Sequence, residues 1–488
     1  MTSSLNKSIY RSVDWITIGF YVLFVIWGWF TICSAAYNFD EPNVFGLDSN
    51  SGKQLLWIVL ACVIAGILLA VEKRWYEMHS TIIYWAFIAI LAVTLVIAPD
   101  TKGSRSWIPL GFMKLQPAEF AKFGVALILG HLLDKLGFSM GNRKDSLKAA
   151  FYILLPMAII ILQRETGSAL VYLAFFLMLY REGMTGTVLF YFFAAVVYFV
   201  VGIRYEEELF NAMPVSIGEF SVLLLAQIFT TGLTYFVIDD KQTAKWMGII
   251  GVGTTLVLTL FSMYVIPFDF TWILILLNLA QVVYLIYLGI NIRVNRCFVI
   301  AAFAFISTIF YYISGTILDH MEDHQRVRIE VLLGKKSDKR GAEYNVNQAK
   351  IAIGSGGLSG KGFLKGTQNK LRYVPEQETD FIFCTIGEEG GFIMSFILLV
   401  CFLLFIWRII YLAERQPDTP GRVYGYSVAC IFIFHVFINV GMVIGITPVI
   451  GIPLPFFSYG GSSLFGFTIL LFIFLRMDAE SRLSYKVQ

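Results

Sequence analysis

The chain has 488 residues; 57% are hydrophobic and only 15% are charged, against roughly 25% charged residues in a soluble domain. This composition excludes a soluble single-core protein and a disordered chain, and six cysteines are too few for a disulfide scaffold. The net charge of +3 provides no basic field, so we expect no nucleic-acid partner. The remaining class is an all-α polytopic membrane protein.

About fourteen segments are apolar over roughly the 20 residues that a helix needs to cross a bilayer. Their apolar runs do not alternate as the strands of a β-barrel would, and the first segment is expected to be a retained helix rather than a cleaved signal. In chain order the predicted spans are 15–36, 55–71, 82–98, 116–133, 150–163, 168–180, 187–203, 219–238, 247–266, 271–290, 297–317, 391–407, 423–447 and 462–475.

The fifth and sixth spans are short and could be taken for one long helix. Thr166, Gly167 and Ser168 lie between them and favour a break.

The basic residues of the short loops predict the orientation of the spans. With the N-terminus inside, 19 Lys and Arg residues fall in inner segments, against six in the short outer loops. Both termini are therefore expected in the cytoplasm. One long segment, 318–388, then lies outside; its basic residues do not oppose this orientation, because long loops cross largely regardless of charge.

The long outer segment is expected to be functional rather than disordered, because it mixes apolar residues with glycines at apparent turns. Its cluster Gly354, Gly356, Gly357, Gly360 and Gly362 does not fit the nucleotide P-loop spacing. The alternatives are tight turns, or bare backbone N–H groups that meet a diphosphate together with Lys361 or Lys365.

Asp338 lies among four cations in this segment, which should keep its carboxylate ionised. Such a group can act as a general base or hold a metal, although a solvated loop charge is the more common case.

Several membrane-level motifs each allow a structural and a functional interpretation. Glu119 and Lys122 share one helix face, as an internal ion pair or as the lining of a cavity. Gln163, Arg164 and Glu165 form a second polar island. Trp107 is typical of an interfacial anchor, whereas the prolines and glycines of 448–463 indicate irregular backbone that lines a cavity. The five histidines are scattered and lack a cysteine or histidine cluster for a metal, and five of the six cysteines lie in or beside apolar spans.

The motifs, in this order, resemble those of the SEDS (shape, elongation, division and sporulation) family of peptidoglycan polymerases. Lys350-Ile351-Ala352-Ile353-Gly354-Ser355 and Gly366-Thr367-Gln368 resemble the rod-shape-determining RodA branch more than the FtsW division branch. The resemblance covers most of the chain, and its motifs lie at 105–111, 115–119, 325–328, 344–357, 360–362, 366–368, 379–383, 387–389, 451–456 and 458–463.

The resemblance implies a peptidoglycan glycosyltransferase that polymerises lipid II at the outer face of the cytoplasmic membrane, for elongation and rod shape. It implies Asp338 as the catalytic base and a class B penicillin-binding transpeptidase and the elongation machinery as partners, with a divalent cation such as Mg²⁺ as the expected cofactor. The implied substrate residues are Arg105, Trp107, Glu119, Lys122, Arg326, Arg328, Lys350, Lys361, Thr379, Asp380 and Ser458.

The sequence departs from the family pattern at several positions, among them Glu165, which stands where the family has an aspartate. Lys339 and Glu343 replace a proline and a glycine beside Asp338, and Glu378 replaces a histidine. The chain is also longer than the ten-helix family core, by about four helices. We therefore divide it into core residues 1–203, inserted helices 204–296 with boundaries within 187–317, a core helix 297–317, the catalytic loop 318–388 and core residues 389–488.

Two rival functions remain open at this point. A lipid II flippase would use Glu119, Lys122, Gln163 and Glu165 as a polar path. A non-catalytic scaffold would only position the transpeptidase.

Overall fold

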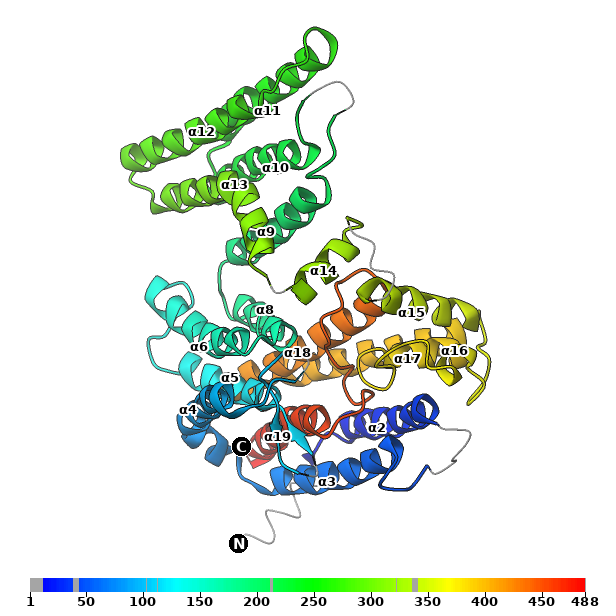
Figure 1. Cartoon of the computed structure of the whole chain (residues 1–488). Helices are drawn as coiled ribbons and strands as arrows, with labels where there is room; N and C mark the ends of the chain where they lie inside the picture. The colour runs from blue at the N-terminus through cyan, green and yellow to red at the C-terminus, as the bar shows by residue number, and fades with distance from the viewer. Residues whose placement is uncertain are drawn as a thin grey trace. The chain divides into compact units, whose positions relative to one another are not determined.

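The computed structural model describes residues 12–37, 44–101, 103–111, 113–210, 214–321, 323–335 and 341–487. Its regular structure is helical apart from a short antiparallel hairpin, β1 (Ile108–Pro109) and β2 (Lys114–Leu115), which confirms the predicted all-α class (Figure 1). The chain forms two compact units: Met1–Thr185 with Tyr344–Gln488 is unit 1, and Gly186–Glu343 is unit 2.

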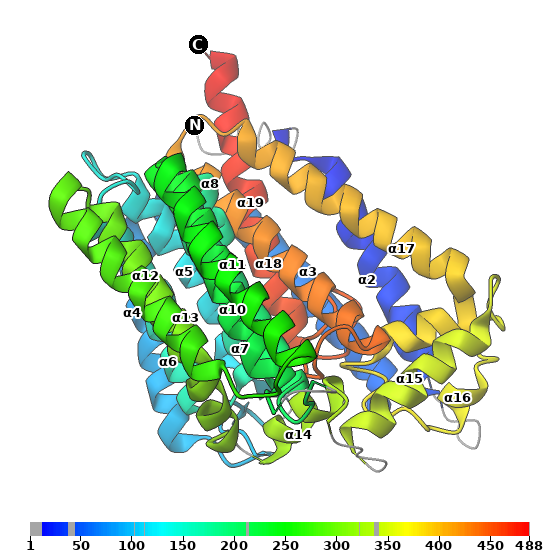
Figure 2. The same ribbon diagram turned by 90° about the horizontal axis from the view of Figure 1, so that it is seen from above.

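Unit 1 contains the two ends of the chain. Within it α4 packs on α5, α18 on both α17 and α5, and α3 on α19, while α2 and α17 run side by side (Figure 2). Its helices are α2 (Trp15–Ala36), α3 (Asn50–Ala70), α4 (Lys73–Ile97), α5 (Pro117–Leu133), α6 (Arg143–Leu162), α7 (Thr166–Val171), α8 (Ala174–Arg181), α15 (Ala342–Gly356, which starts at the unit boundary), α16 (Thr367–Lys370), α17 (Ile382–Glu414), α18 (Thr419–Ile444) and α19 (Gly461–Val487).

Local signals define several of these helix ends. Asp14 caps α2 by accepting from the Thr17 N–H, and Asp418 caps α18 by accepting from the Gly421 N–H. α18 ends at Ile444 and is capped by Gly445, whose φ of 78° lies in the left-handed region that glycine tolerates.

α17 is kinked at Gly391, where φ is 67° and the backbone is not helical. The glycine-rich loop after α15 lies against this kink: Gly357 O accepts from the Phe392 N–H, and the Gly362 N–H donates to Glu389 O. A Cβ atom on Gly360 would lie 2.1 Å from Glu389 O. These glycines therefore permit close backbone packing, as the tight-turn interpretation predicts.

Unit 2 contains α9 (Gly186–Arg204), α10 (Ile217–Leu233) with the π-helical turn η1 (Thr234–Ile238), α11 (Lys241–Tyr264), α12 (Thr271–Ile292), α13 (Asn295–Asp319) and α14 (Asp323–Leu332). α13 packs on α9, α10 and α12, and α11 packs on α10. The core of these helices includes Tyr198, Val222, Leu285 and Ile300.

Each of the fourteen predicted spans corresponds to helical structure. Among the described residues, twelve helices are long and apolar enough to cross a membrane. The other two spans are α5, which has 17 residues, and the shorter apolar stretch Thr166–Arg181 made by α7 and α8. The helix break lies at 163–165, where Arg164 has a φ of 62°, so Thr166–Ser168 begin the second helix instead of separating the two.

The predicted outer segment 318–388 is largely helical where it is described. It contains α14, α15, α16 and the first turns of α17, which begins at Ile382 rather than near 391. Unit 2 spans 186–343, and the predicted insertion 204–296 lies inside it; the assignment of that range as an insertion stays a prediction.

Candidate site at the loop ends of unit 1

The residues predicted for the site fall into three groups. Asp338 lies outside the described residues, as do Lys339 and the other residues of 336–340. Arg326 and Arg328 lie on α14 of unit 2, where Arg326 pairs with Asp319 at 3.0 Å and with Glu330 at 2.7 Å. The other nine predicted residues belong to unit 1.

Thr379, Asp380 and Ser458 are brought together by the segment that follows α18. The Ser458 hydroxyl donates to Thr379 O at 2.7 Å and accepts from the Leu454 N–H at 2.8 Å. Asn439 of α18 donates to Asp380 O at 2.9 Å and to Ile452 O at 2.8 Å. These bonds join two segments far apart in the sequence, 379–380 and 452–458, into one loop cluster. They also satisfy backbone polar groups of the irregular segment, as is required at membrane depth.

Lys350 on α15 faces the end of α18. A Cβ atom built on Gly445 would lie 2.4 Å from Lys350 Nζ, so the glycine leaves room for this ammonium group. On the same segment, a Cβ atom on Gly451 would lie 3.2 Å from Asp380 Oδ2. Among the described residues Lys350 is exposed and forms no ion pair, so its positive charge is available to a ligand.

Lys361, by contrast, is neutralised. Its Nζ donates to Glu388 Oε1 at 2.7 Å and to the Thr367 hydroxyl at 2.7 Å. Glu388 is fully buried and also accepts from the backbone N–H groups of Gln368 and Asn369. These bonds attach the loop before α16, and α16 itself, to α17. The positive charge of Lys361 is balanced by the carboxylate of Glu388.

Glu119 and Lys122 form a buried ion pair on α5, with 2.8 Å between Oε2 and Nζ. His435 of α18 joins them: its Nε2 lies 3.0 Å from Lys122 Nζ, and its Nδ1 lies 3.0 Å from Pro453 O. Because a carbonyl oxygen only accepts, Nδ1 carries the ring proton and Nε2 accepts from the ammonium group. The exposed fractions of Glu119, Lys122 and His435 are 2%, 1% and 0%. Of the two interpretations given for Glu119 and Lys122, the contacts agree with an internal ion pair. A substrate role for these residues stays a prediction.

The segment before β1 is anchored to the break between α6 and α7. The Arg105 N–H donates to Gln163 O at 2.9 Å, and the Ser106 hydroxyl donates to Glu165 Oε2 at 2.9 Å. Arg105 is exposed and Trp107 is half-buried. The polar island 163–165 therefore positions the predicted residues Arg105 and Trp107.

Two neighbouring cavities of about 330 Å³ and 380 Å³ open among the loops of unit 1. Both are lined by Asn50, Arg372 and Glu378, and Glu378 accepts from the Asn50 amide. Glu378, where the resemblance expects a histidine, thus faces a polar cavity.

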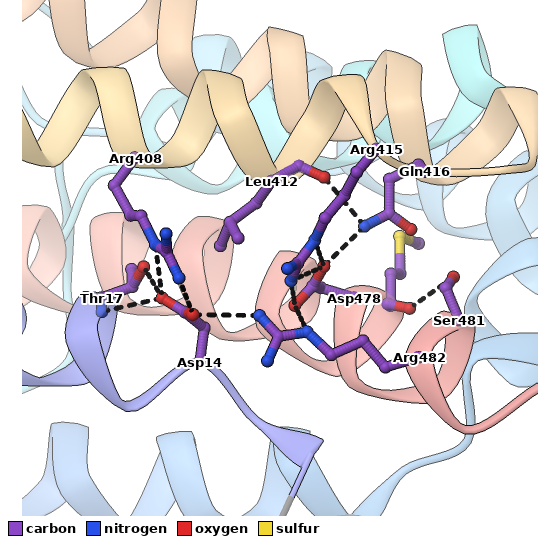
Figure 3. Close-up of polar contacts among 10 residues, drawn as sticks. Asp14, Thr17, Arg408, Leu412, Arg415, Gln416, Asp478, Ser481 and Arg482 are labelled. Atoms are coloured by element: carbon purple, nitrogen blue, oxygen red, sulfur yellow. Dashed lines mark hydrogen bonds and ion pairs between the residues drawn. The ribbon is translucent and has the colours of Figure 1, made fainter. Parts of the chain in front are cut away.

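A network of ion pairs at the opposite helix ends of unit 1 was missed by sequence reasoning (Figure 3). Asp14 accepts from Arg408 and Arg482, and Asp478 accepts from Arg415 and Arg482. Burial raises the pKa of the Asp14 carboxyl, but hydrogen bonds from Arg408, Thr17 and Arg482 outweigh this effect and hold that pKa well below the ordinary aspartate value. The network ties the start of α2 to the ends of α17 and α19. The charged residues of this network are too far apart in the sequence to indicate that they contact one another.

No group of three or more His, Cys, Asp or Glu side chains gathers among the described residues in a way that could hold a metal ion. Asp338 lies outside these residues, so the expected Mg²⁺ stays a prediction.

Comparison with known proteins places these features in a family. The FtsW/RodA/SpoVE family of cell cycle proteins matches residues 14–214 and 218–483. The peptidoglycan glycosyltransferase RodA of Treponema pallidum is 30% identical over 436 residues, which cover 88% of this chain and 89% of that protein. The peptidoglycan glycosyltransferase MrdB of Escherichia coli K12 is 43% identical over 203 residues, 41% of this chain and 53% of that protein.

The fold has solved counterparts. A chain from a structure described as the coordination of polymerization and crosslinking by a peptidoglycan synthase complex superposes with a TM-score of 0.58 at 19% identity, over 96% of this chain and 98% of that one. With the matched motifs and the polytopic helical fold, these findings show that the chain belongs to the FtsW/RodA/SpoVE family, whose members the sequence resembled.

Proposed function

We propose that the protein is a peptidoglycan glycosyltransferase that polymerises lipid II into glycan strands for cell elongation and rod shape. The observation that carries the proposal is the similarity over 88% of the chain to a protein named peptidoglycan glycosyltransferase RodA. The cluster of Thr379, Asp380 and Ser458 supports it, together with Lys350, which forms no ion pair among the described residues, because a diphosphate leaving group requires a cationic, polar surface at a loop end.

In this reaction a sugar hydroxyl of the acceptor attacks the anomeric carbon of the donor. The Asp338 carboxylate accepts the hydroxyl proton as the new C–O bond forms. The bond from the anomeric carbon to undecaprenyl diphosphate breaks, with inversion, and negative charge grows on the diphosphate. The apolar spans would hold the two prenyl tails.

Lys350 is the better candidate to stabilise that charge in unit 1. Lys361 already forms an ion pair with the buried carboxylate of Glu388. Lys350, by contrast, is exposed and has no ion-pair partner among the described residues. Arg326 and Arg328 of unit 2 remain candidates for the same role.

The assignment of Asp338 is tested by the purified protein acting on fluorescent lipid II, with products separated on a gel. Asp338→Asn should yield no polymer while remaining folded. Glu207→Gln, which removes an exposed carboxylate of another predicted outer loop, is the matched control and should polymerise normally. Polymer from Asp338→Asn at the wild-type rate contradicts the assignment, and lipid II transport into liposomes without any polymer would favour the flippase.

The Lys350 assignment is tested in the same assay against Lys114→Gln, which changes an exposed lysine of the β1–β2 hairpin. Lys350→Gln should reduce kcat about tenfold or more without lowering thermal stability. Equal rates for the two variants would remove Lys350 from the reaction. Addition of EDTA, followed by Mg²⁺, tests the expected cation: polymerisation should fall and then recover.

We further propose that the protein lies in the bacterial cytoplasmic membrane with both termini inside, and that it works with a class B penicillin-binding transpeptidase of the elongation machinery. The bias of Lys and Arg supports the orientation. The description of a structural relative as a complex for polymerization and crosslinking supports the partner. Co-purification with the transpeptidase, and polymerisation measured with and without it, test this proposal.

A further inference from the structure

A cavity of about 810 Å³ lies between the end of α5 and the start of α6 in unit 1, away from the loop cluster of the proposed active site. Its lining combines two chemistries. Lys135, Lys144 and Lys148 supply positive charge, and the exposed apolar side chains of Leu136, Leu147 and Phe151 lie among them. Neither the resemblance nor the proposed reaction uses these residues.

The positive charge of this cavity is poorly compensated. Its one acidic lining residue, Asp145, is buried and accepts from the Asn142 amide at 2.9 Å, while Lys148 Nζ lies 3.7 Å away. Among the described residues Lys135 and Lys144 form no ion pair. By the order of the spans, this is the same membrane side on which seven other basic residues of unit 1 are paired with acids: Lys73, Arg181, Arg408, Arg415, Arg422, Arg476 and Arg482. Figure 3 shows the pairs of Arg408, Arg415 and Arg482.

We propose that the α5–α6 cavity binds an anionic phospholipid of the adjacent leaflet. Lysines near a membrane surface attract anionic headgroups, and basic pockets between spanning helices bind them. Lys135, Lys144 and Lys148 would contact the phosphate, and an acyl chain would cover Leu136, Leu147 and Phe151. A small water-soluble anion would satisfy the lysines but would leave the apolar lining exposed, so the mixed lining favours a lipid.

The test uses the full-length protein in nanodiscs and native mass spectrometry of the lipids retained after release. Discs contain phosphatidylethanolamine with either phosphatidylglycerol or cardiolipin. The wild type should retain the anionic lipids at least fivefold over phosphatidylethanolamine, and the triple variant Lys135→Gln, Lys144→Gln, Lys148→Gln should lose most of this preference. The matched control removes three exposed basic residues on the same predicted side, Arg74→Gln, Lys241→Gln and Lys245→Gln, and should keep it.

A second variant separates the lipid from a simple anion. Leu147→Ser with Phe151→Ser keeps the lysines and should also weaken lipid retention, whereas inorganic phosphate at 10 mM should not compete. Equal loss in the control triple variant, competition by phosphate, or retention that ignores headgroup charge overturns the proposal. Lipid II polymerisation is measured separately, so failure here leaves the proposed function standing.

Discussion

The interiors of the two units differ in whether they bury charge: among the described residues both bury amides and hydroxyls, but only unit 1 buries charged side chains. Among the described residues, all buried charged side chains belong to unit 1: Asp14, Glu119, Lys122, Asp145, Glu388, Arg476 and Asp478. The described interior of unit 2 buries amides and hydroxyls instead, such as Gln227, Thr255, Asn278 and Gln281. Gln227 accepts from the Thr255 hydroxyl at 3.0 Å, but the Nε2 atoms of Gln227 and Gln281 have no partner among these residues.

The difference indicates different constraints on the two interiors. A buried charge in a membrane protein is costly unless it is paired, so charges are retained where they fix a particular arrangement or serve function. Unit 1 pairs some of its buried charges within one helix, as in Glu119–Lys122, and others between segments distant in sequence, as in Asp14–Arg408 and Asp478–Arg415. The described interior of unit 2 is filled by apolar side chains and neutral polar groups, and hydrogen bonds of the latter kind contribute only modestly.

The largest expected effect comes from separating the buried pair of unit 1. Lys122→Met should lower the free energy of unfolding by about 3–5 kcal/mol, because Glu119 would remain buried without its partner. Unfolding in mixed micelles with increasing SDS measures the change. The double variant Glu119→Gln, Lys122→Met should recover most of the loss; if it is no more stable than Lys122→Met, the unpaired charge is not the cause.

A smaller loss is expected at Glu388. Glu388→Gln should cost about 1.5–3 kcal/mol, because a charged acceptor of Lys361 and of two backbone N–H groups becomes neutral. Limited proteolysis should show earlier cleavage in the glycine-rich loop after α15. Glu376→Gln, at an exposed position, provides the control; similar cleavage of both variants would contradict the role of Glu388.

Asp14 should make the stability of unit 1 dependent on pH. Because its folded-state pKa is lowered, its contribution is complete above the unfolded aspartate value of about 3.9 and is lost as the pH falls toward the folded value. Asp14→Asn keeps an N-cap side chain, removes the charge and should cost about 1 kcal/mol at pH 7. The melting temperatures of Asp14→Asn and of the wild type, measured at pH 7, 5, 4 and 3, should differ by a constant amount above pH 4 and begin to approach each other below it; parallel curves over the whole range would contradict the prediction.

The smallest effect is expected in unit 2. Gln227→Leu with Thr255→Val removes both partners of a buried neutral hydrogen bond and should change the free energy of unfolding by less than about 1 kcal/mol. A loss as large as that of Lys122→Met would remove the contrast between the two interiors.

Much of the fold could be predicted because membrane crossing depends on local composition. A run of about 20 apolar residues is visible in the sequence, and each of the fourteen predicted spans corresponds to helical structure. The start of α17 was missed because Phe383, Cys384 and Ile386 adjoin the charged residues 388–389, and the kink at Gly391 depends on the loop that packs against it. The break before α7 was predicted at 166–168 but lies at 163–165. Local composition does not locate the backbone turn at Arg164.

The sequence by itself determined the membrane class, the family motifs and the spacing of Glu119 and Lys122 on one helix face. Only the tertiary structure decided that His435 completes this pair and that Asp14 joins Arg408 and Arg482. It also decided that Glu388 neutralises Lys361, while Lys350 has no acidic partner among the described residues. The physical reason is range. Hydropathy and helical periodicity act over a few turns, whereas each of these charges finds its partner at a sequence separation that only helix packing can close.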